Sequence, residues 1–155
     1  MKLKKIGTIK EDNDGLYIQI DEPYKNALIG LEGFSHLHIL WWADQLDQPD
    51  MRSITTVDKP YKPGPELLGI FATRSPLRPN PICTTIITVT DLSVSTGIIR
   101  TWYIDGEPET PVLDIKPYLP CSDYPTTTSS PEWSTMLPKS IEASAEFDWD
   151  NYFNF

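Results

Sequence analysis

The sequence predicts a mainly β protein, a small antiparallel β-barrel with one or two short helices. Segments rich in β-branched and aromatic residues recur at short spacing, and turn-forming Gly, Pro, Asp and Asn residues separate them. Helical periodicity is scarce along the chain. A succession of short strands joined by turns favours an antiparallel barrel or sandwich.

The N-terminal third predicts three strands and one helix. We expect strands over residues 3–9 and 16–20, joined by a polar turn at 10–15 that contains Asp-Asn-Asp-Gly. Residues 22–31 carry an early proline and an apolar side, which predicts a short helix that ends before a glycine. Residues 34–42 are mostly apolar and aromatic, which predicts a buried strand.

The middle of the chain predicts one long loop and three strands. Residues 44–66 are polar, contain proline and show no clear period, so we expect a loop with a function or a covering role. Strands are expected at 67–73 and, from their β-branched residues, at 82–89 and 97–104. A turn at 91–96 separates the last two.

The C-terminal part divides into the end of a barrel domain and an extension. An acidic turn at 105–110 precedes a short strand at 112–116, which a proline ends. The barrel domain is expected to span residues 1–120. The extension, residues 121–155, begins rich in Ser, Thr and Pro and ends rich in aromatic and acidic residues. We expect this extension to pack on the barrel or on a partner subunit, with a frayed end as the alternative.

The charge of the chain disfavours, but does not exclude, a nucleic-acid partner. Thirteen basic and 22 acidic residues give a net charge of -9. Residues 119–155 hold six acidic residues and one lysine, so that more than half of the net negative charge lies there. Nucleic-acid affinity comes largely from cations that neutralise phosphates, and the sequence contains no basic stripe.

Two further features bear on the location of the protein. Cys83 and Cys121 are not closely spaced in the sequence, so we expect both thiols to be reduced. The longest apolar run, residues 37–43, is too short to span a membrane, and the N-terminus lacks the core of a signal peptide. We therefore expect a cytoplasmic protein without membrane contact.

The most informative stretch is residues 68–81, where the expected strand leads into a loop. The stretch contains two arginines, and three of its last six residues are prolines. Proline fixes its own φ and restricts the residue before it, so this loop loses little entropy on ordering. Such a loop suits the positioning of Arg74 and Arg78 around a ligand. The alternative is a surface turn with two solvated arginines.

The histidines and cysteines give weak signals. His36 and His38 share a face of the expected strand, but no third ligand is spaced to complete a metal site, and we expect no metal. Ser35 and His36 lack an acidic partner for a nucleophilic triad. Cys83 follows the arginine loop, where cations lower a thiol pKa, but a buried, inert cysteine is the stronger expectation.

A second polar cluster lies between Thr110 and Tyr118. In a strand, Asp114 and Lys116 point the same way. They form either an ion pair on a wet face, which is worth little, or, with the Tyr118 phenol, a site around a ligand. Spacing alone leaves both interpretations open.

Three motifs together resemble the TsaA-like, or TrmO-like, family: Gly-Leu-Glu-Gly-Phe-Ser-His at 30–36, Gly-Ile-Phe-Ala-Thr-Arg-Ser-Pro-Leu-Arg-Pro-Asn-Pro-Ile at 69–82, and Thr-Pro-Val-Leu-Asp-Ile-Lys-Pro-Tyr at 110–118. The resemblance covers roughly residues 3–120. It implies a small β-barrel methyltransferase that uses S-adenosyl-L-methionine and works as a homodimer, with the cofactor near the subunit interface. The best-known reaction of the family methylates N6 of a threonylcarbamoyl-adenosine beside the tRNA anticodon.

The resemblance also assigns site residues. Arg74 matches the family's cofactor-contacting arginine. The residues expected to bind the cofactor are Asp44, Gln45, Arg74, Arg78, Cys83, Thr84, Thr110 and Pro111. The residues expected to act in catalysis are Asp114, Lys116 and Tyr118.

Departures from the family pattern leave three functions open. Cys83-Thr84 replaces the usual Gly-Leu, and Pro108-Glu109 replaces the usual Asp-Gly. The usual Pro-Arg-Gln element between the first strands and a basic segment before the third are also missing. The first reading is a methyltransferase acting on tRNA, the second is one acting on a small metabolite, and the third is a non-catalytic module that binds S-adenosylmethionine.

Overall fold

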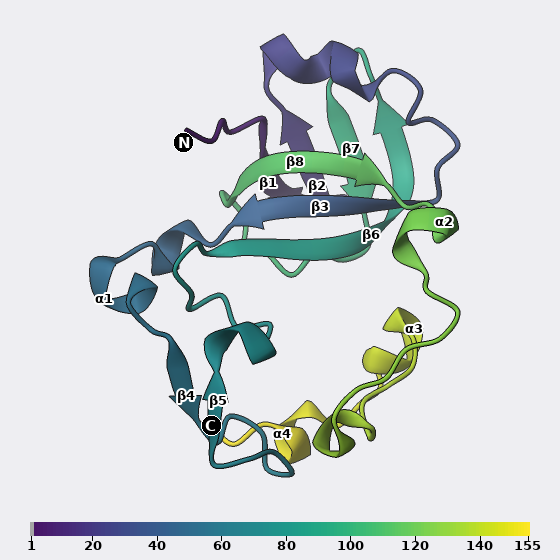
Figure 1. The fold of residues 1–155 in the computed structure, drawn as a ribbon. Helices are drawn as coiled ribbons and strands as arrows, with labels where there is room; N and C mark the ends of the chain where they lie inside the picture. The colour runs from purple at the N-terminus through teal and green to yellow at the C-terminus, as the bar shows by residue number, and fades with distance from the viewer. Residues whose placement is uncertain (1) are drawn as a thin grey trace.

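Residues 2–155 form a closed antiparallel β-barrel with an arm and a C-terminal extension, as described by a computed structural model (Figure 1). Within these residues, six strands follow one another around the barrel in the order β1-β2-β7-β6-β3-β8. Their bounds are β1 Gly7–Asp12, β2 Gly15–Ile20, β3 His36–Trp42, β6 Ile82–Ser93, β7 Ile98–Thr101 and β8 Pro111–Pro117. The predicted fold class is confirmed.

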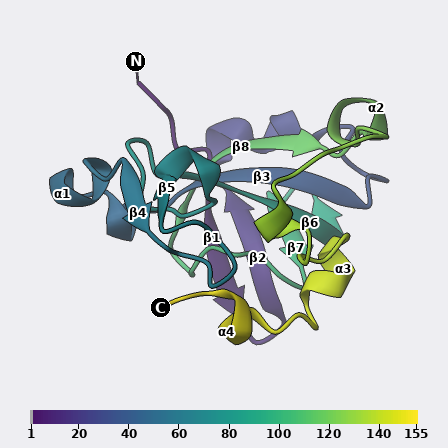
Figure 2. The same ribbon diagram turned by 60° about the horizontal axis from the view of Figure 1, so that its bottom comes forward.

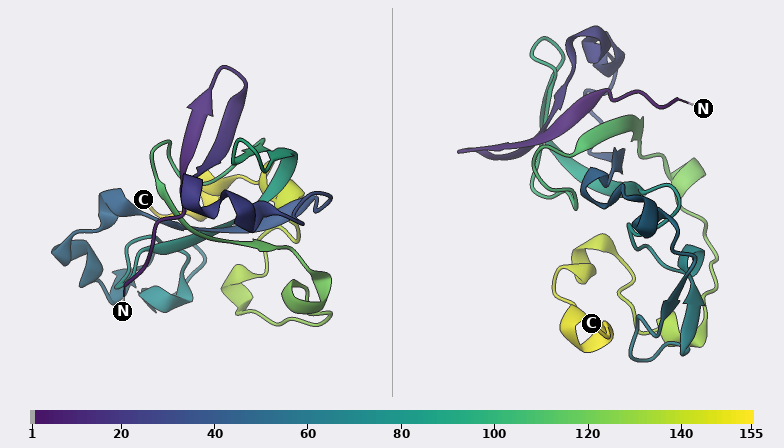
Figure 3. Two further views of the ribbon diagram at one scale, coloured as in Figure 1. Left: turned by 90° about the horizontal axis from the view of Figure 1, so that it is seen from above. Right: turned by 90° about the vertical axis from the view of Figure 1, so that its left-hand side faces the viewer.

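Strands β1 and β2 form a hairpin that projects beyond the rest of the barrel (Figure 3). Gly7 pairs with Ile20 and Asp12 pairs with Gly15, so that only two residues remain in the turn. Gly15 has φ of 105°, a conformation that suits glycine. The predicted turn at 10–15 is therefore too long, because a two-residue turn lets both strands pair to their ends. The first strand also begins later than predicted.

The core of the barrel contains every second side chain of its strands. In β3, Leu37, Ile39 and Trp41 point inwards and are at most 7% exposed. The indole Nε1 of Trp41 donates a hydrogen bond of 3.1 Å to Thr85 Oγ1, which satisfies a polar atom inside the core. The same alternation places Trp42 on the outer face of β3.

A bulge in β8 decides which of its side chains face outwards. Val112 lies opposite Trp41, but Asp114 lies opposite Leu40, so Leu113 is an extra residue on β8. Val112 is fully buried in the core. Asp114, beside the outward-facing Leu40, is on the outer surface of the barrel.

An arm leaves the barrel between β3 and β6. After β3 the chain forms η2 Asp44–Leu46 and α1 Pro49–Arg52, and then the arm, residues 56–69, in which β4 Thr56–Asp58 pairs with β5 Leu67–Gly69. η3, Ile70–Ala72, follows directly. The prediction of one loop at 44–66 is wrong, and so is the prediction of a single strand at 67–73. β5 ends after three residues because it pairs only with the equally short β4, outside the barrel.

Three other predicted elements differ in type or length. The predicted helix at 22–31 is η1, a 3₁₀ helix over Glu22–Leu28. β6 continues through Ser93, beyond the predicted strand end, because a bulge after Val89 keeps it paired with β7. β7 is shorter than predicted and ends at Thr101.

The C-terminal extension crosses from the barrel to the arm. Its short elements are α2 Pro120–Asp123, η4 Glu132–Ser134, α3 Ile141–Ser144 and α4 Trp149–Tyr152. The chain leaves β8 at α2, passes α3 and ends beside β4 and β5 (Figures 1 and 2). Near the barrel, Asp123 Oδ1 lies 3.2 Å from His38 Nε2, a buried atom that has no well-aligned hydrogen-bond partner among the described residues. At the far end, Tyr152 is buried against Tyr61 of the arm.

Candidate functional site

A pocket of about 830 Å³ lies where the arginine loop, residues 73–81, meets the first residues of β6. Ligand sites commonly have volumes of roughly 300–1,000 Å³. The loop lies between the barrel and the arm, in teal in Figure 1. The lining residues are Trp41, Phe71, Thr73, Arg74, Pro76, Arg78, Pro79, Asn80, Ile82, Cys83, Thr84 and Asp105.

The arginine loop is built by hydroxyl groups as well as by prolines. Thr73 Oγ1 donates a hydrogen bond to Ile70 O and accepts one from the backbone N–H of Ser75. Ser75 Oγ in turn accepts a hydrogen bond from Leu77 N. These turns give the loop a defined start immediately after η3, and the prolines stiffen its remainder.

Both arginines of the loop line the pocket. Arg74 Nη2 lies 3.3 Å from Thr84 Oγ1 and 3.4 Å from Thr84 O, so its guanidinium rests against the start of β6. Arg78 Nη1 donates to Ser75 O at 3.2 Å, and its guanidinium lies 5.8 Å from the ring centroid of Phe71. Phe71 is 77% exposed, so one wall of the pocket presents an aromatic ring and two cations.

Arg52 ties the far end of the loop to the barrel. Its Nε donates to Pro79 O at 2.9 Å, and its Nη2 donates to Asn80 Oδ1 at 3.2 Å. Its Nη1 donates to Asp47 Oδ1, whose carboxylate also accepts from Trp42 Nε1. The pocket wall is thus held at both of its ends.

Asp105 supplies a carboxylate to the same pocket. Its Oδ1 accepts a hydrogen bond of 3.1 Å from the hydroxyl of Tyr103. Burial raises the pKa of Tyr103, and the neighbouring Asp105 raises it further, so that this phenol stays protonated and donating at neutral pH. Next to Asp105, Gly106 has no room for a side chain, because an added Cβ would lie 2.5 Å from Ile9 Cδ1 and 3.4 Å from the ring of Trp41.

Cys83 is a protonated thiol rather than a nucleophile. Burial raises its pKa first, and the Asp105 carboxylate adds to the rise. Arg78 and Arg74 offset the rise only in part. Cys83 is half-buried and lines the pocket rather than being fully buried as expected, and its raised pKa agrees with the expectation of an inert thiol.

Four of the predicted cofactor residues share this pocket and four do not line it. Arg74, Arg78, Cys83 and Thr84 meet there. Asp44 and Gln45 are exposed in η2, directly after β3. Thr110 is buried, and Pro111 begins β8 opposite Thr8. The cofactor-binding roles assigned to all eight residues stay predictions.

The predicted catalytic residues lie together on the outside of β8 and do not line the pocket. Lys116 Nζ is 2.6 Å from Asp114 Oδ2, which confirms that the two side chains share a face. Both are at least 47% exposed, and the pair is an ion pair on a wet face. Tyr118 stacks on His38, with ring centroids 5.7 Å apart. Their catalytic role stays a prediction.

Among the pocket residues that the predicted site does not include are Phe71 and Asp105. The expected strand at 67–73 contains Phe71, whereas this residue lies in η3 and is exposed. Asp105 was counted as part of an acidic turn. The available signal was the Asp-Gly pair at 105–106, three residues before Pro108-Glu109. The family pattern described above has an Asp-Gly pair shortly before the Thr-Pro-Val-Leu-Asp motif.

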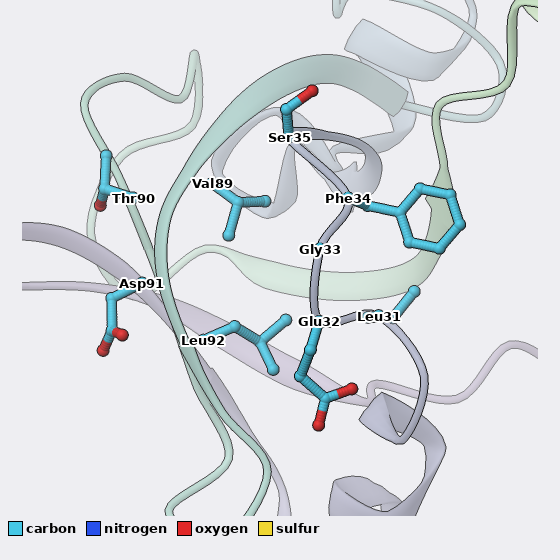
Figure 4. A pocket seen from close by; sticks show the side chains of 9 residues that line it. All are labelled: Leu31, Glu32, Gly33, Phe34, Ser35, Val89, Thr90, Asp91 and Leu92. Atoms are coloured by element: carbon cyan, nitrogen blue, oxygen red, sulfur yellow. The ribbon is translucent and has the colours of Figure 1, made fainter.

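A second, smaller pocket of about 340 Å³ lies on the barrel between residues 31–35 and the outer part of β6. Figure 4 labels the residues that line it: Leu31, Glu32, Gly33, Phe34, Ser35, Val89, Thr90, Asp91 and Leu92. Its charged groups are two carboxylates, and it contains none of the predicted site residues. It therefore offers a poor match to an anionic ligand group.

In the part of the chain that the structure describes, no three His, Cys, Asp or Glu residues are grouped to hold a metal ion. None of the helices within residues 2–155 has the length and apolar character needed to traverse a bilayer.

The barrel and its pocket define a class of small antiparallel β-barrel proteins with a ligand-sized pocket beside β3 and β6. The sequence profile of the tRNA-methyltransferase O N-terminal domain matches residues 7–124. The chain belongs to this family, and the predicted family resemblance is confirmed.

Three similar proteins illustrate the relationship. A probable S-adenosyl-L-methionine-binding protein of Halobacterium salinarum is 33% identical over 102 residues, which cover 66% of this chain and 74% of that protein. The tRNA (adenine(37)-N6)-methyltransferase of Escherichia coli is 34% identical over 140 residues, which cover 89% of this chain and 57% of that enzyme. The crystal structure of TrmO from Pseudomonas aeruginosa superposes with a TM-score of 0.64 and 25% identity, over 85% of this chain and 61% of that one. The chain thus spans less than two thirds of the length of the last two proteins.

Proposed function

We propose that this protein binds S-adenosylmethionine in the arginine-loop pocket and transfers the methyl group of this cofactor to an acceptor. The observation that carries the proposal is the meeting of Arg74, Arg78 and Asp105 around one ligand-sized pocket. S-adenosylmethionine contains a carboxylate, an ammonium group, a sulfonium and an adenine ring. Two guanidiniums, one carboxylate and aromatic rings are the groups that such a molecule requires.

Four of the pocket residues have a proposed role in binding. Arg74 pairs with the carboxylate of the cofactor, because its two long contacts to Thr84 leave most of its five donors for a ligand. Phe71, whose ring is contacted by the Arg78 guanidinium, supports the adenine ring of the cofactor. Asp105 receives the ammonium group. The name of the Halobacterium salinarum relative supports this choice of ligand.

The bound cofactor supplies a methyl group that is already activated by its sulfonium centre. The chain therefore has to align the acceptor with that methyl group, exclude water and accept a proton if the acceptor carries one. Asp114, Lys116 and Tyr118 are our candidates for the acceptor side. They lie on the outer face of β8 and away from the pocket of their own chain, so we propose that they serve the pocket of a second subunit in a homodimer.

The first candidate acceptor is an adenine base of tRNA. The name of the Escherichia coli relative supports this acceptor. The net charge of -9 and the acidic extension instead favour a small-molecule acceptor.

The second candidate function is binding of S-adenosylmethionine without transfer. The ion pair of Asp114 with Lys116 favours this second function, because each of the two charged groups is already neutralised by the other.

Methyl-transfer assays separate these possibilities. Radiolabelled S-adenosylmethionine is incubated with the protein and either bulk tRNA or a low-molecular-weight extract, and calorimetry measures cofactor binding in parallel. Label in tRNA supports the first acceptor, and label in the extract alone supports a small-molecule acceptor. Binding without label in either fraction supports the second candidate function. Absence of cofactor binding at millimolar concentration contradicts the proposal as a whole.

The homodimer has its own test. An equimolar mixture of Arg74→Ala and Asp114→Asn chains, refolded together, contains mixed dimers with one intact site. Regained transfer activity in the mixture, when each variant alone is inactive, is the expected result. A monomer in light scattering, or a mixture that stays inactive, contradicts the shared site.

A further inference from the structure

The aromatic end of the C-terminal extension packs on one residue of the arm, Tyr61. Trp133 stacks on the Tyr61 ring with centroids 5.1 Å apart and an interplanar angle of 16°. Tyr152 lies at a centroid distance of 5.1 Å and Phe153 at 5.9 Å from the same ring. Tyr152 is only 2% exposed, so this cluster is a small core of its own.

Backbone hydrogen bonds fix the same contact. Lys62 N donates to Tyr152 O at 2.9 Å, and Asn154 N donates to Pro60 O at 3.0 Å, on either side of a bridge between Tyr61 and Phe153. Lys62 Nζ also donates to Asp150 O at 2.7 Å. The end of the chain therefore adds a short antiparallel pairing to the arm, and this pairing holds Tyr61 from its backbone as well as from its ring.

Tyr61 also connects the arm to the pocket. Burial raises the pKa of Tyr61, and the nearby backbone of Arg74 lowers it in part. The phenol thus lies against the backbone of the residue that we assign to the cofactor's carboxylate. A second connection runs through β4 and β5, because Ile70 N donates to Thr55 O at 2.8 Å and η3 leads directly into Thr73.

We propose that the C-terminal extension positions the cofactor pocket, with Tyr152 and Tyr61 as positioning residues that hold the backbone at Arg74. The match to the N-terminal domain of the family ends at residue 124, so Tyr152 lies beyond that domain. The effect on cofactor binding rests on the function proposed above, whereas the effect on the order of the arginine loop does not. Loss of the aromatic packing loosens residues 70–77 and lowers cofactor affinity.

Hydrogen exchange measured by mass spectrometry on the full, cofactor-free chain tests the positioning directly. Tyr152→Ala removes the packing, Tyr152→Phe retains the ring, and Tyr124→Ala changes an exposed tyrosine of the same extension. We expect Tyr152→Ala to speed exchange in residues 59–62 and 70–77 by about tenfold, equivalent to about 1.4 kcal/mol of local opening. β3 and β6 keep their protection in this variant, and the other two variants match the wild type.

Cofactor binding provides the second readout. The dissociation constant of S-adenosylmethionine, measured by calorimetry, rises about tenfold in Tyr152→Ala and returns to the wild-type value in Tyr152→Phe. Unchanged exchange in residues 70–77 overturns the inference. Faster exchange in residues 70–77 with an unchanged dissociation constant overturns its cofactor part. If the wild type binds no cofactor, the proposed function fails, and exchange alone still decides the positioning.

A second variant covers the case in which Tyr152→Ala unfolds the whole chain. Tyr61→Phe keeps the stacked ring and removes only the hydroxyl beside the Arg74 backbone. Faster exchange around Arg74, with unchanged exchange in residues 59–62, supports the contact. Wild-type exchange around Arg74 in Tyr61→Phe overturns it.

Discussion

The guanidinium of Arg74 lies 3.3 Å from the hydroxyl of Thr84, so the arginine loop and the first residues of β6 meet at one wall of the pocket. Thr84 faces outwards from the barrel, and the neighbouring Cys83 faces inwards. The contact between Arg74 and Thr84 therefore fixes the position at which the arginine loop meets the barrel. The position of the cation therefore depends on both the loop and the strand.

Replacement of Arg74 tests its role in binding. A hydrogen bond to a charged group contributes about 1.5–3 kcal/mol, so we expect Arg74→Ala to weaken S-adenosylmethionine binding about 10- to 100-fold. Arg74→Lys keeps the charge without the planar fork and should retain part of the affinity. Arg100→Ala is the matched control, because Arg100 pairs with Asp12 on the hairpin and does not line the pocket. Equal affinity in Arg74→Ala and wild type would remove Arg74 from the site.

The carboxylate of Asp105 should control the reactivity of Cys83. Asp105 contributes to the raised pKa of this thiol, so Asp105→Asn should shift the pKa downwards. At a pH below that pKa, the variant then holds more thiolate and reacts faster with iodoacetamide. The pH dependence of alkylation, with Cys121 followed in the same sample by mass spectrometry, measures the shift. An unchanged or higher pKa of Cys83 would show that the two groups do not interact.

Two glycines should differ sharply in their tolerance of alanine. A Cβ at Gly7 would lie 2.6 Å from the backbone oxygen of Gln19, within the β1–β2 pairing. We therefore expect Gly7→Ala to lower the free energy of unfolding by about 1–3 kcal/mol, the usual cost of overpacking. At Gly69 an added Cβ meets no described atom within 4 Å, and Gly69→Ala should change stability by less than about 1 kcal/mol. Urea unfolding followed by circular dichroism compares the two, and similar losses at both positions would contradict the register of the hairpin.

The hairpin should lose stability in acid through Asp12. The side-chain hydrogen bond from Arg100 holds the pKa of Asp12 below its ordinary value in the folded state. A depressed folded pKa contributes stability above the unfolded pKa, about 3.9, and this contribution is lost as pH falls through the folded pKa. Thermal unfolding between pH 6 and pH 2 should therefore show a smaller acid-induced decrease in Asp12→Asn than in wild type. A decrease of the same size in both proteins would show that this pair does not contribute to acid sensitivity.

The barrel strands were predictable because their patterns are local. The alternating burial of β3 and the β-branched residues of β6 belong to the segments themselves. The boundaries were not predictable, since β5 ends at Gly69, opposite Thr56 at the start of its antiparallel partner β4, and pairing with a distant segment leaves no local signal. Phe71 was misplaced for this reason, because an apolar residue after a short strand resembles a continuation of that strand.

The site was predictable in part, through the family motifs. The motif around the arginine loop led to Arg74 and Arg78, which share the pocket with Thr84. Asp105 was missed because it lies in a turn outside the arginine-loop motif, and only the folded chain brings it to the pocket. The bulge at Leu113, which turns Asp114 outwards, depends on pairing between β8 and β3 and leaves no mark in the sequence.

Hydrogen exchange of the wild-type chain with and without S-adenosylmethionine tests most directly whether the cofactor binds in the arginine-loop pocket. We expect protection of residues 71–84 and 103–106, the segments that line this pocket. Protection confined to residues 31–35 and 89–92, which line the smaller pocket, would contradict it. Absence of protection anywhere at a saturating cofactor concentration would contradict it equally.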